Sequence, residues 1–403
     1  SMSRINLRVL PRLRPACASR GLHATPRTRI DETIRKGDLY EYSVVYTDRV
    51  YNLMSSPFQE CMREISASLK TVYNAQTSVV IPGSGTYAME AVARQFATGN
   101  KTLILRHGFF SYRWSQILEQ GGISNDNVVL KAVATSADPL PQFKPLELDD
   151  IEQRILQEKP KVVFAPHVET STGIILPDEY LRRIGDAARR VGALFVLDGI
   201  ASGTVWVDME ACNVDVFISA PQKGWSGPAC CGLVMLNGRA TETLKQTQSS
   251  SFTLDLKQWV DVMAAYEGGA FKYYTTLPTD ALMTFRDAMQ ETRAMGLDEA
   301  RAAMLSLGTG VRAAAEAAGF KSVAAPGFAA PGVAVFYAPT PNMVPEFKAR
   351  GMQIAAGVPW FLDEPQGLNT FRLGLFGLDK LKNVDVATKR VSEGMQDIAA
   401  SLK

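Results

Sequence analysis

The amino-acid sequence predicts a large α/β domain followed by a small α+β domain. The chain has 403 residues, which is more than a single hydrophobic core usually serves. From about Val79, short β-rich segments alternate with helical patterns, as in a parallel or mixed sheet covered by helices. Beyond a long helical stretch that begins near Asp280 and breaks near Gly296, the pattern thins into shorter units. We therefore place the large domain, with an N-terminal arm, at residues 31–295 and the small domain at 296–403.

The individual elements follow from local periodicity. Helical spacing of apolar residues is expected after the turn at Pro82, with Gly99 as the C-cap, and again after Pro177. In the small domain we expect strands at 333–337 and 371–376 and a closing amphipathic helix from Val384. Short apolar runs predict buried strands of the large domain at 79–81, 103–105, 162–165, 193–197, 214–218 and 233–236.

Composition narrows the class of protein. Apolar residues make up 46% and charged residues 21%, as in ordinary soluble globular proteins, and no stretch reaches the roughly 18 apolar residues of a membrane span. The three histidines and the absence of CxxC spacing argue against a metal site and a disulfide framework, so we expect reduced thiols in an intracellular compartment. The five cysteines are Cys17, Cys61, Cys212, Cys230 and Cys231.

The first 30 residues have a composition of their own. They contain seven arginines and no Asp, Glu or Lys. An Arg-rich, acid-free leader with Ser, Ala and Leu between the charges predicts a mitochondrial transit peptide and a matrix location. The alternative is a disordered basic tail without a targeting function. Without these arginines, 36 basic residues remain against 41 acidic ones, so a nucleic-acid partner is not expected.

The unusual residues of the sequence collect where the expected strands end, which is where ligands of open α/β sheets bind. The first such place is the turn Pro82-Gly83-Ser84-Gly85-Thr86 between a strand and a helix. Its glycines allow close approach of the backbone, and free N–H groups at a helix N-terminus bind phosphate. The turn matches neither a dinucleotide-binding fingerprint nor a P-loop. Taken alone, it is equally compatible with an ordinary turn before a helix.

Two charged residues follow other expected strands. Asp198 ends an apolar segment, where a carboxylate is costly unless it meets a cation such as a protonated pyridine nitrogen; a helix cap or a loop ion pair is the alternative. Lys223 stands among small, apolar and turn-forming residues without a neighbouring charge. A partly desolvated lysine has a lowered pKa and can form a Schiff base with an aldehyde. Both residues can point into one cleft, since each follows its own strand.

An aromatic residue and an arginine complete the candidate site. Phe110, after another expected strand, can stack on a flat heterocycle, although a core aromatic is the commoner explanation. Arg372 lies within an apolar strand and needs an anionic partner. That partner is either a substrate carboxylate held bidentately or a structural Asp or Glu.

The order of these motifs resembles class V aminotransferases of pyridoxal-phosphate fold type I. From about Val79 onward the chain presents Gly-Ser-Gly, an aromatic residue, Glu-Thr-Ser-Thr-Gly, Asp, Ser-x-x-Gln-Lys and a C-terminal Arg. Alanine–glyoxylate and serine–pyruvate aminotransferases look most similar, with 2-aminoethylphosphonate–pyruvate transaminases as relatives. The resemblance implies fold type I, pyridoxal 5′-phosphate as the cofactor and a homodimer.

Residue by residue, the resemblance assigns Lys223 and Asp198 as the catalytic pair, the first attached to the cofactor and the second facing its ring nitrogen. Arg372 is similar to the residue that binds the α-carboxylate of the substrate. The further cofactor contacts that it implies are Ser84, Gly85 and Thr86 at the phosphate, Phe110 and Ile200 on the two ring faces, Thr170 and Gln222, and Tyr273 and Thr276 reaching the phosphate of a neighbouring subunit. Residues 41–49 depart from the Gly-Pro-Gly-like loop of the family, so a different side-chain pocket is expected.

These residues lead to one functional hypothesis and two rivals. The hypothesis is amino-group transfer from a small amino acid of the alanine or serine type to a 2-oxo acid such as glyoxylate or pyruvate; transfer from 2-aminoethylphosphonate is an alternative. A lyase on the same fold is the first rival, but Gln222 stands where desulfurase-like lyases often have His. A degenerate protein of the same fold that serves as a binding or scaffold subunit is the second, and the retention of Lys223, Asp198 and Arg372 counts against it.

Overall fold

The computed structural model describes residues 39–402. The predicted transit peptide at residues 1–30 lies outside the described part of the chain, and it stays a prediction together with the mitochondrial location. The same holds for Cys17.

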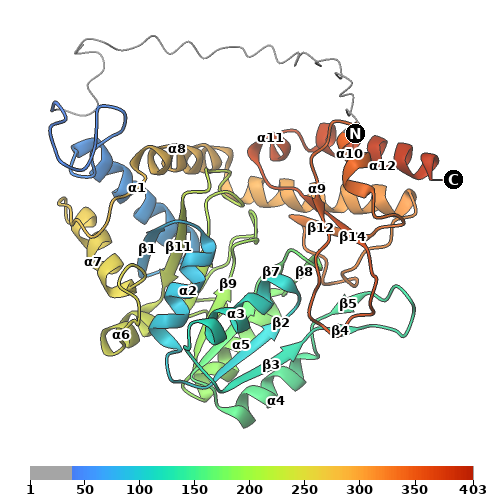
Figure 1. Ribbon diagram of the computed structural model, residues 1–403, viewed down its shortest axis with the longest axis horizontal. Helices are drawn as coiled ribbons and strands as arrows, with labels where there is room; N and C mark the ends of the chain where they lie inside the picture. The colour runs from blue at the N-terminus through green and yellow to red at the C-terminus, as the bar shows by residue number, and fades with distance from the viewer. Residues whose placement is uncertain (1–38, 403) are drawn as a thin grey trace, which may run out of the picture.

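A seven-stranded sheet forms the centre of the molecule (Figure 1). β11 runs antiparallel to both of its neighbours, whereas the strands from β10 to β3 are parallel to one another. The carboxyl ends of these parallel strands therefore share one edge of the sheet, where ligands bind in such folds. In spatial order the strands are β1 (Thr77–Pro82), β11 (Cys231–Leu236), β10 (Val216–Ser219), β9 (Leu194–Asp198), β6 (Val162–Pro166), β2 (Thr102–Arg106) and β3 (Asn127–Lys131).

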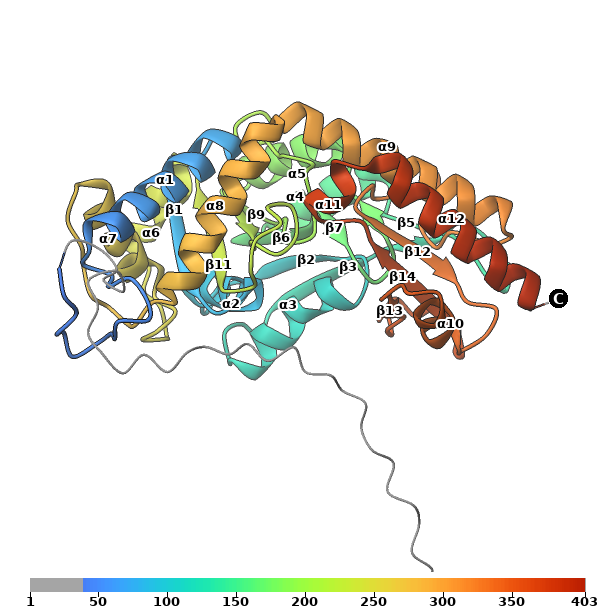
Figure 2. The ribbon, with the colours of Figure 1, turned by 90° about the horizontal axis from the view of Figure 1, so that it is seen from above.

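Helices cover both faces of this sheet. Figure 2 shows α3 on one side of the strands and α4 and α5 on the other. Strands covered on both faces are buried and read as continuous apolar runs, which is why each apolar run that predicted a strand of the large domain overlaps a strand of this sheet. The predicted α/β class is confirmed. The helices are α1 (Ser56–Tyr73), α2 (Gly85–Phe96), α3 (Phe109–Gln120), α4 (Leu148–Glu158), α5 (Asp178–Arg190), α6 (Gly238–Gln246), α7 (Leu256–Glu267) and α8 (Thr279–Met295).

One predicted helix end is wrong. α2 ends at Phe96 and is followed by Ala97 in a right-handed conformation, so Gly99 is not its C-cap. Gly99 instead has a φ of 70° in the following turn, and its N–H donates to the carbonyl of Ile123 at 2.8 Å. The glycine serves the connection to the next strand and does not end the helix.

The C-terminal part of the chain forms a second, smaller sheet under two long helices. Gly296, with a φ of 96°, separates α8 from α9. Fifteen buried residues of this part form a separate hydrophobic cluster that begins at Met304 and ends at Ile398. The predicted boundary between residues 295 and 296 stays a prediction. The elements are α9 (Leu297–Ala317), β12 (Val333–Tyr337), α10 (Met343–Ala349), β13 (Ala355–Ala356), β14 (Thr370–Gly374), α11 (Leu378–Leu381) and α12 (Val384–Ser401), with the sheet order β12-β14-β13.

A further hydrophobic cluster joins the two parts. It combines Phe143 and Ile174 from the first part with Val335 and Trp360 from the second. Two small hairpins contribute to it, β4 (Val133–Ala134) with β5 (Phe143–Lys144) and β7 (Val168–Glu169) with β8 (Ile174–Ile175). The loop 357–369 between β13 and β14 adds a contact with α3, because the rings of Phe361 and Tyr112 stack with centroids 4.1 Å apart.

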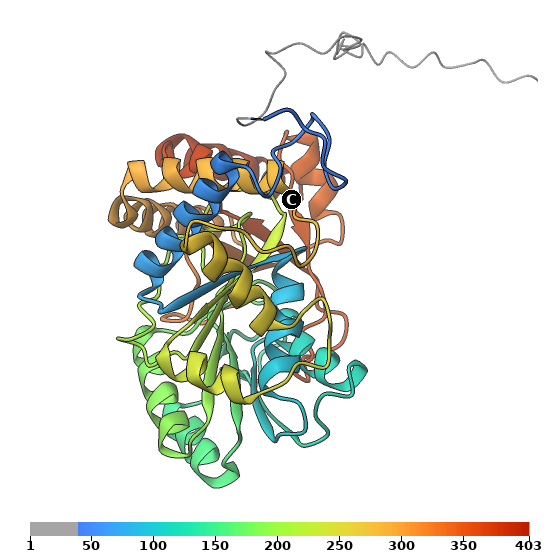
Figure 3. The same ribbon diagram turned by 90° about the vertical axis from the view of Figure 1, so that its left-hand side faces the viewer.

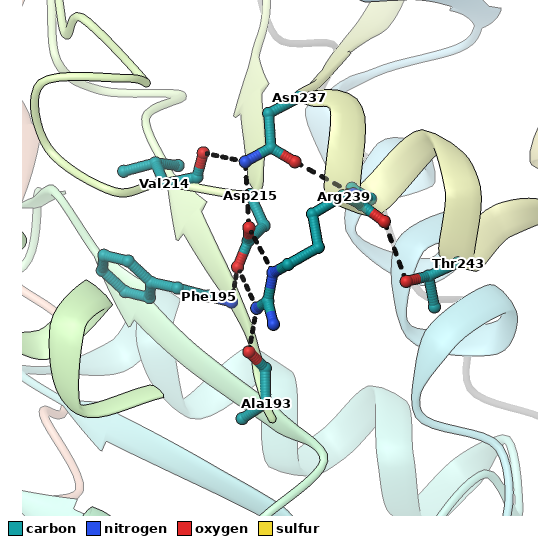
Figure 4. A network of polar contacts seen from close by, with 8 residues as sticks. Ala193, Phe195, Val214, Asp215, Asn237, Arg239 and Thr243 are labelled. Carbon is teal, nitrogen blue, oxygen red and sulfur yellow. Dashed lines mark hydrogen bonds and ion pairs between the residues drawn. The ribbon is translucent and has the colours of Figure 1, made fainter. Parts of the chain in front are cut away.

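A polar cluster ties β9, β10 and β11 together at the edge of the sheet opposite the carboxyl ends of β9 and β10 (Figure 4). The fully buried carboxylate of Asp215 accepts hydrogen bonds from the Phe195 N–H at 2.8 Å and the Asn237 amide at 2.9 Å. It also forms an ion pair with Arg239 at 2.6 Å. Arg239 donates in addition to the Ala193 carbonyl. A buried carboxylate is tolerated when it is paired in this way.

The described residues contain no helix that is both long enough and apolar enough to cross a membrane. Within residues 39–402, no group of three or more His, Cys, Asp or Glu side chains is arranged to hold a metal ion. Cys61, Cys212, Cys230 and Cys231 are buried free thiols.

Candidate active site

A cavity of about 390 Å³ opens at the carboxyl edge of the parallel strands. It brings together all of the predicted site residues except Tyr273 and Thr276, although the roles assigned to them stay predictions. The predicted residues that line it are Ser84, Gly85, Thr86, Phe110, Thr170, Asp198, Ile200, Gln222, Lys223 and Arg372. Sequence reasoning missed the other lining residues, which are Met89, Arg113, Val168, Ala201, Val333, Ala355, Gly374 and Phe376.

The turn before α2 presents backbone and hydroxyl donors to the cavity. Ser84 is the extended residue that precedes α2, and among the described residues its side chain makes no capping hydrogen bond to the helix. The first N–H groups of a helix have no partner within it, so they are free to bind an anion. A Cβ at Gly85 would lie 2.5 Å from Cδ1 of Ile200, so a side chain there would displace Ile200 from its place in the cavity wall. The turn therefore fits a phosphate group.

Asp198 ends β9 and is nearly inaccessible to solvent. Burial, with a smaller effect from the charge of Glu169, raises the pKa of its carboxyl group to about 7, against the lowering effects of the hydrogen bond from the Ile200 N–H at 3.0 Å and of Arg113. A carboxyl group with such a pKa becomes fully ionised when a cation lies beside it. Asp198 thus fits the protonated nitrogen of a pyridine ring.

Lys223 follows β10 in a turn, with its Nζ 5.2 Å from the centroid of the Phe376 ring. Burial lowers the pKa of the Lys223 amine, and the positive charge of Arg372 lowers it further. No residue in the described part of the chain forms a hydrogen bond or an ion pair with this amine. A lowered pKa increases the fraction of unprotonated amine, which is the form that attacks an aldehyde or accepts a proton.

Arg372 reaches the cavity from β14 of the smaller sheet. Its Nε donates to the Ala356 carbonyl at 2.8 Å, and its Cζ lies 5.7 Å from the ring centroid of Phe110. Burial lowers the pKa of the Arg372 guanidinium, and the charge of Glu169 opposes that effect. Since a partly desolvated guanidinium is stabilised by an anion, Arg372 fits a substrate carboxylate.

Glu169 supports the wall of the cavity, and sequence reasoning gave it no role. Its fully buried carboxylate accepts hydrogen bonds from the N–H groups of Phe110, Ser111 and Ser171 and from the hydroxyls of Ser111 and Ser171, at 2.7–3.2 Å. It thereby fixes the first residues of α3. The adjoining Gly108 has no room for a side chain, because a Cβ there would lie 2.0 Å from Oγ of Ser171. The clue to Glu169 in the sequence was that three hydroxyl residues follow it directly, in Glu169-Thr170-Ser171-Thr172.

The cavity carries more positive than negative charge. Its cations are Arg113, Lys223 and Arg372, and the described residues that line it contain a single carboxyl group, that of Asp198. In residues 39–402, none of these cations has a carboxylate within ion-pair distance, whereas Arg183, Arg239 and Arg286 elsewhere are all paired. Oε1 of Gln222 is also buried without a partner among the described residues. Such a set of groups fits a ligand with anionic ends and a polar ring, as pyridoxal phosphate with an amino acid would provide.

Tyr273 and Thr276 lie away from this cavity. They occupy the segment between α7 and α8, both are exposed, and their hydroxyl oxygens are 3.4 Å apart. The expected contact with the phosphate of a neighbouring subunit stays a prediction.

The strand order, a lysine after one strand, a carboxylate at the end of the neighbouring strand and a turn that fits a phosphate together indicate a pyridoxal-phosphate enzyme of fold type I. The chain belongs to the class V aminotransferase family, a pyridoxal-phosphate-dependent family whose match covers residues 25–315. The predicted family and fold type are confirmed.

Named relatives agree with this assignment. The chain is 28% identical to the L-aspartate–glyoxylate aminotransferase of Paracoccus denitrificans over 296 residues, which cover 73% of this chain and 70% of that protein. It is 30% identical to the serine–glyoxylate aminotransferase of Hyphomicrobium methylovorum over 244 residues, which cover 60% and 58%. The solved structure of a ureidoglycine–glyoxylate aminotransferase from Bacillus subtilis has the same fold, with a TM-score of 0.74, 23% identity and 87% of each chain covered.

Proposed function

We propose that the protein binds pyridoxal phosphate and transfers the amino group of a small amino acid, of the alanine or serine type, to a 2-oxo acid such as glyoxylate or pyruvate. The observation that carries the proposal is the set of unpaired cations around Asp198 in one cavity of the described residues. Membership of a family of aminotransferases supports the reaction class. The names of the Paracoccus denitrificans and Hyphomicrobium methylovorum relatives support glyoxylate as an acceptor.

The residues of the cavity divide the chemistry among them. When bound, pyridoxal phosphate supplies an electron-withdrawing ring that weakens the bond between Cα and its proton. Lys223, with its lowered pKa, would accept that proton as a general base and then, as a general acid, deliver it to the cofactor carbon that carried the aldehyde. Asp198 holds a proton on the ring nitrogen through a charge-assisted hydrogen bond. Arg372 binds the α-carboxylate and fixes the Cα–H bond within reach of Lys223.

Absorbance spectra of the purified protein test the reaction. We expect a near-visible band from lysine-bound cofactor that is lost when L-alanine or L-serine is added alone and returns with glyoxylate or pyruvate, because the amino group is stored on the protein between the two half-reactions. 2-Aminoethylphosphonate serves as the comparison donor. A band that responds to it and not to the amino acids would replace the proposed substrate. Release of pyruvate or ammonia without any acceptor would contradict transfer and indicate a lyase.

We also propose that the protein is a homodimer in which Tyr273 and Thr276 complete the phosphate site of the partner subunit. Apolar side chains exposed on one region of the surface support an interface there. They lie in the N-terminal segment and on both sides of α7, the part of the molecule that faces the viewer in Figure 3. These exposed residues are Tyr42, Val44, Phe252, Phe271 and Tyr273.

Mixed dimers test this arrangement. One subunit carries Lys223→Ala, and the other carries Tyr273→Phe with Thr276→Val. Each variant dimer alone is expected to lose activity, whereas the mixed dimer should regain about half of the wild-type activity per dimer, because its one intact lysine is served by the intact loop of the other subunit. If the mixed dimer stays as inactive as its parents, the loop acts on its own subunit and the shared site is wrong.

A further inference from the structure

Among the described residues, Arg113 is the one cation of the cavity to which the proposed function gives no role. It lies in α3 one helical turn after Phe110, so both side chains are on the same face of the helix. Its Nη1 donates to Oγ1 of Thr86 at 2.9 Å, and its Cζ lies 5.2 Å from the ring centroid of Phe110. Throughout the described residues it has no ion-pair partner. A cation placed in this way, beside a cavity and without a counter-ion, indicates an anionic group of the ligand.

The contact with Thr86 indicates which anionic group this is. Thr86 is the second residue of α2, directly after the turn that fits a phosphate. A phosphate carries about 1.5–2 negative charges at neutral pH, whereas the end of a helix offers only about half a positive charge. Lys223 and Arg372 are committed to the aldehyde and to the substrate carboxylate. Arg113 is the remaining cation of the described lining, and its guanidinium keeps N–H donors beyond the one bonded to Thr86.

We propose that Arg113 is the charge partner of the cofactor phosphate within the subunit and that it holds the Thr86 hydroxyl in the phosphate turn. The inference rests on the proposed function, because it assigns a residue to the cofactor named there. The charge of Arg113 also reaches Asp198, whose pKa it lowers. One side chain on α3 thus acts on both the phosphate turn and the carboxylate at the end of β9.

Two other roles for Arg113 make different predictions. Its position over the Phe110 ring would orient that ring by a cation–π contact, and this would affect the ring of the cofactor and not its phosphate. Alternatively, Arg113 would bind a second carboxylate of a dicarboxylic substrate. The bond to Thr86 favours the phosphate, because it places the guanidinium beside the phosphate turn, whereas Arg372 is tied to Ala356 on the smaller sheet.

Binding of pyridoxal phosphate and of pyridoxal to the cofactor-free protein separates these roles. We expect Arg113→Gln to weaken binding of pyridoxal phosphate by about 10- to 100-fold, the range of a charge-assisted contact, and to leave binding of pyridoxal within about 2-fold. Arg113→Lys keeps the charge and should recover part of the loss. Thr86→Val removes only the hydroxyl and should have a smaller effect. Arg154→Gln, on the surface of α4 and paired with Glu158, is the matched control and should change neither affinity.

Each other outcome has a definite meaning. Equal losses for pyridoxal phosphate and pyridoxal would overturn the proposal and assign Arg113 to Phe110. Unchanged cofactor binding with a raised KM for aspartate, but not for alanine, would overturn it in favour of a second carboxylate. If Arg113→Gln does not fold, Arg113→Lys decides by whether its loss is confined to the phosphorylated form. If the wild-type protein binds no pyridoxal phosphate at all, the proposed function itself fails.

Discussion

Replacing Lys223 with alanine is expected to remove the covalent attachment of pyridoxal phosphate and to lower kcat by at least about 10³-fold. Among the described residues that line the cavity, its amine is the one group that can both attack an aldehyde and accept a proton at neutral pH, and loss of a general base alone costs about 10²–10⁴-fold. Reduction with borohydride followed by mass spectrometry measures the attachment, which should be present in the wild type and absent in the variant.

The matched control for this experiment is Lys245→Ala. That lysine is exposed on α6 and paired with Glu242, so both the labelling and the turnover should remain at the wild-type level. A labelled peptide that still forms in the Lys223→Ala protein and maps to another lysine would show that the attachment site is elsewhere.

Replacing Asp198 with asparagine is expected to lower kcat by about 10²–10³-fold, the usual effect of losing one preorganised electrostatic group. Asparagine keeps the shape and loses the charge, so the ring nitrogen would no longer hold its proton. Steady-state kinetics with the holoenzyme measure the loss. Asp198→Glu keeps the charge at a shifted position and should retain more activity than Asp198→Asn. If the asparagine variant keeps full turnover, a carboxylate is not needed opposite the ring.

The same substitution has an expected effect on stability. Burial raises the pKa of Asp198 from 3.8 to about 7 in the cofactor-free protein. Between these two pH values the carboxyl group is therefore protonated in the folded state and ionised in the unfolded state. The contribution of the group to stability is therefore fully present below about pH 4 and disappears as the pH rises through 7. Because each tenfold change in proton affinity corresponds to about 1.4 kcal/mol, the loss of unfolding free energy is on the order of a few kcal/mol.

Denaturant unfolding of the cofactor-free protein between pH 5 and 8 measures this contribution. The wild type should lose stability toward pH 8 more steeply than Asp198→Asn, whose amide does not titrate. Parallel curves for the two proteins would show that Asp198 is ionised in the folded state without a ligand.

Within the large sheet, the sequence predicted the strands that are buried on both faces and missed β3, which is not. β9 and β6 are fully buried, whereas β3 is half-buried along its whole length, with its short apolar run Val128-Val129-Leu130 between Asn127 and Lys131. Two-residue strands such as β13 have no periodicity to detect. The C-cap prediction for Gly99 was wrong because a glycine near the end of a helix can either end that helix or form the turn that follows it.

Site residues were predictable where a reactive side chain ends or follows a predicted strand, as for Asp198 and Lys223. They were not predictable where the partner is a backbone group or a distant side chain. Glu169 bonds to N–H groups at the start of α3, and backbone groups leave no mark in the sequence. Arg113 meets Thr86 across 27 positions of the chain. Its spacing of three residues from Phe110 was the available clue.

The Asp215 cluster has a consequence for how activity is distributed among molecules. β10 is only four residues long, so at about 3.3 Å per residue the cluster at one end is about 13 Å from the catalytic end. A slip of one residue between strands turns every side chain to the opposite face, and the paired charges of Asp215 and Arg239 are satisfied in one alignment only. A misaligned molecule would therefore not bring Lys223 and Asp198 together at all, and it would be inactive rather than slower. Damage to this cluster should reduce the number of working molecules in a population, while each survivor turns over at the normal rate.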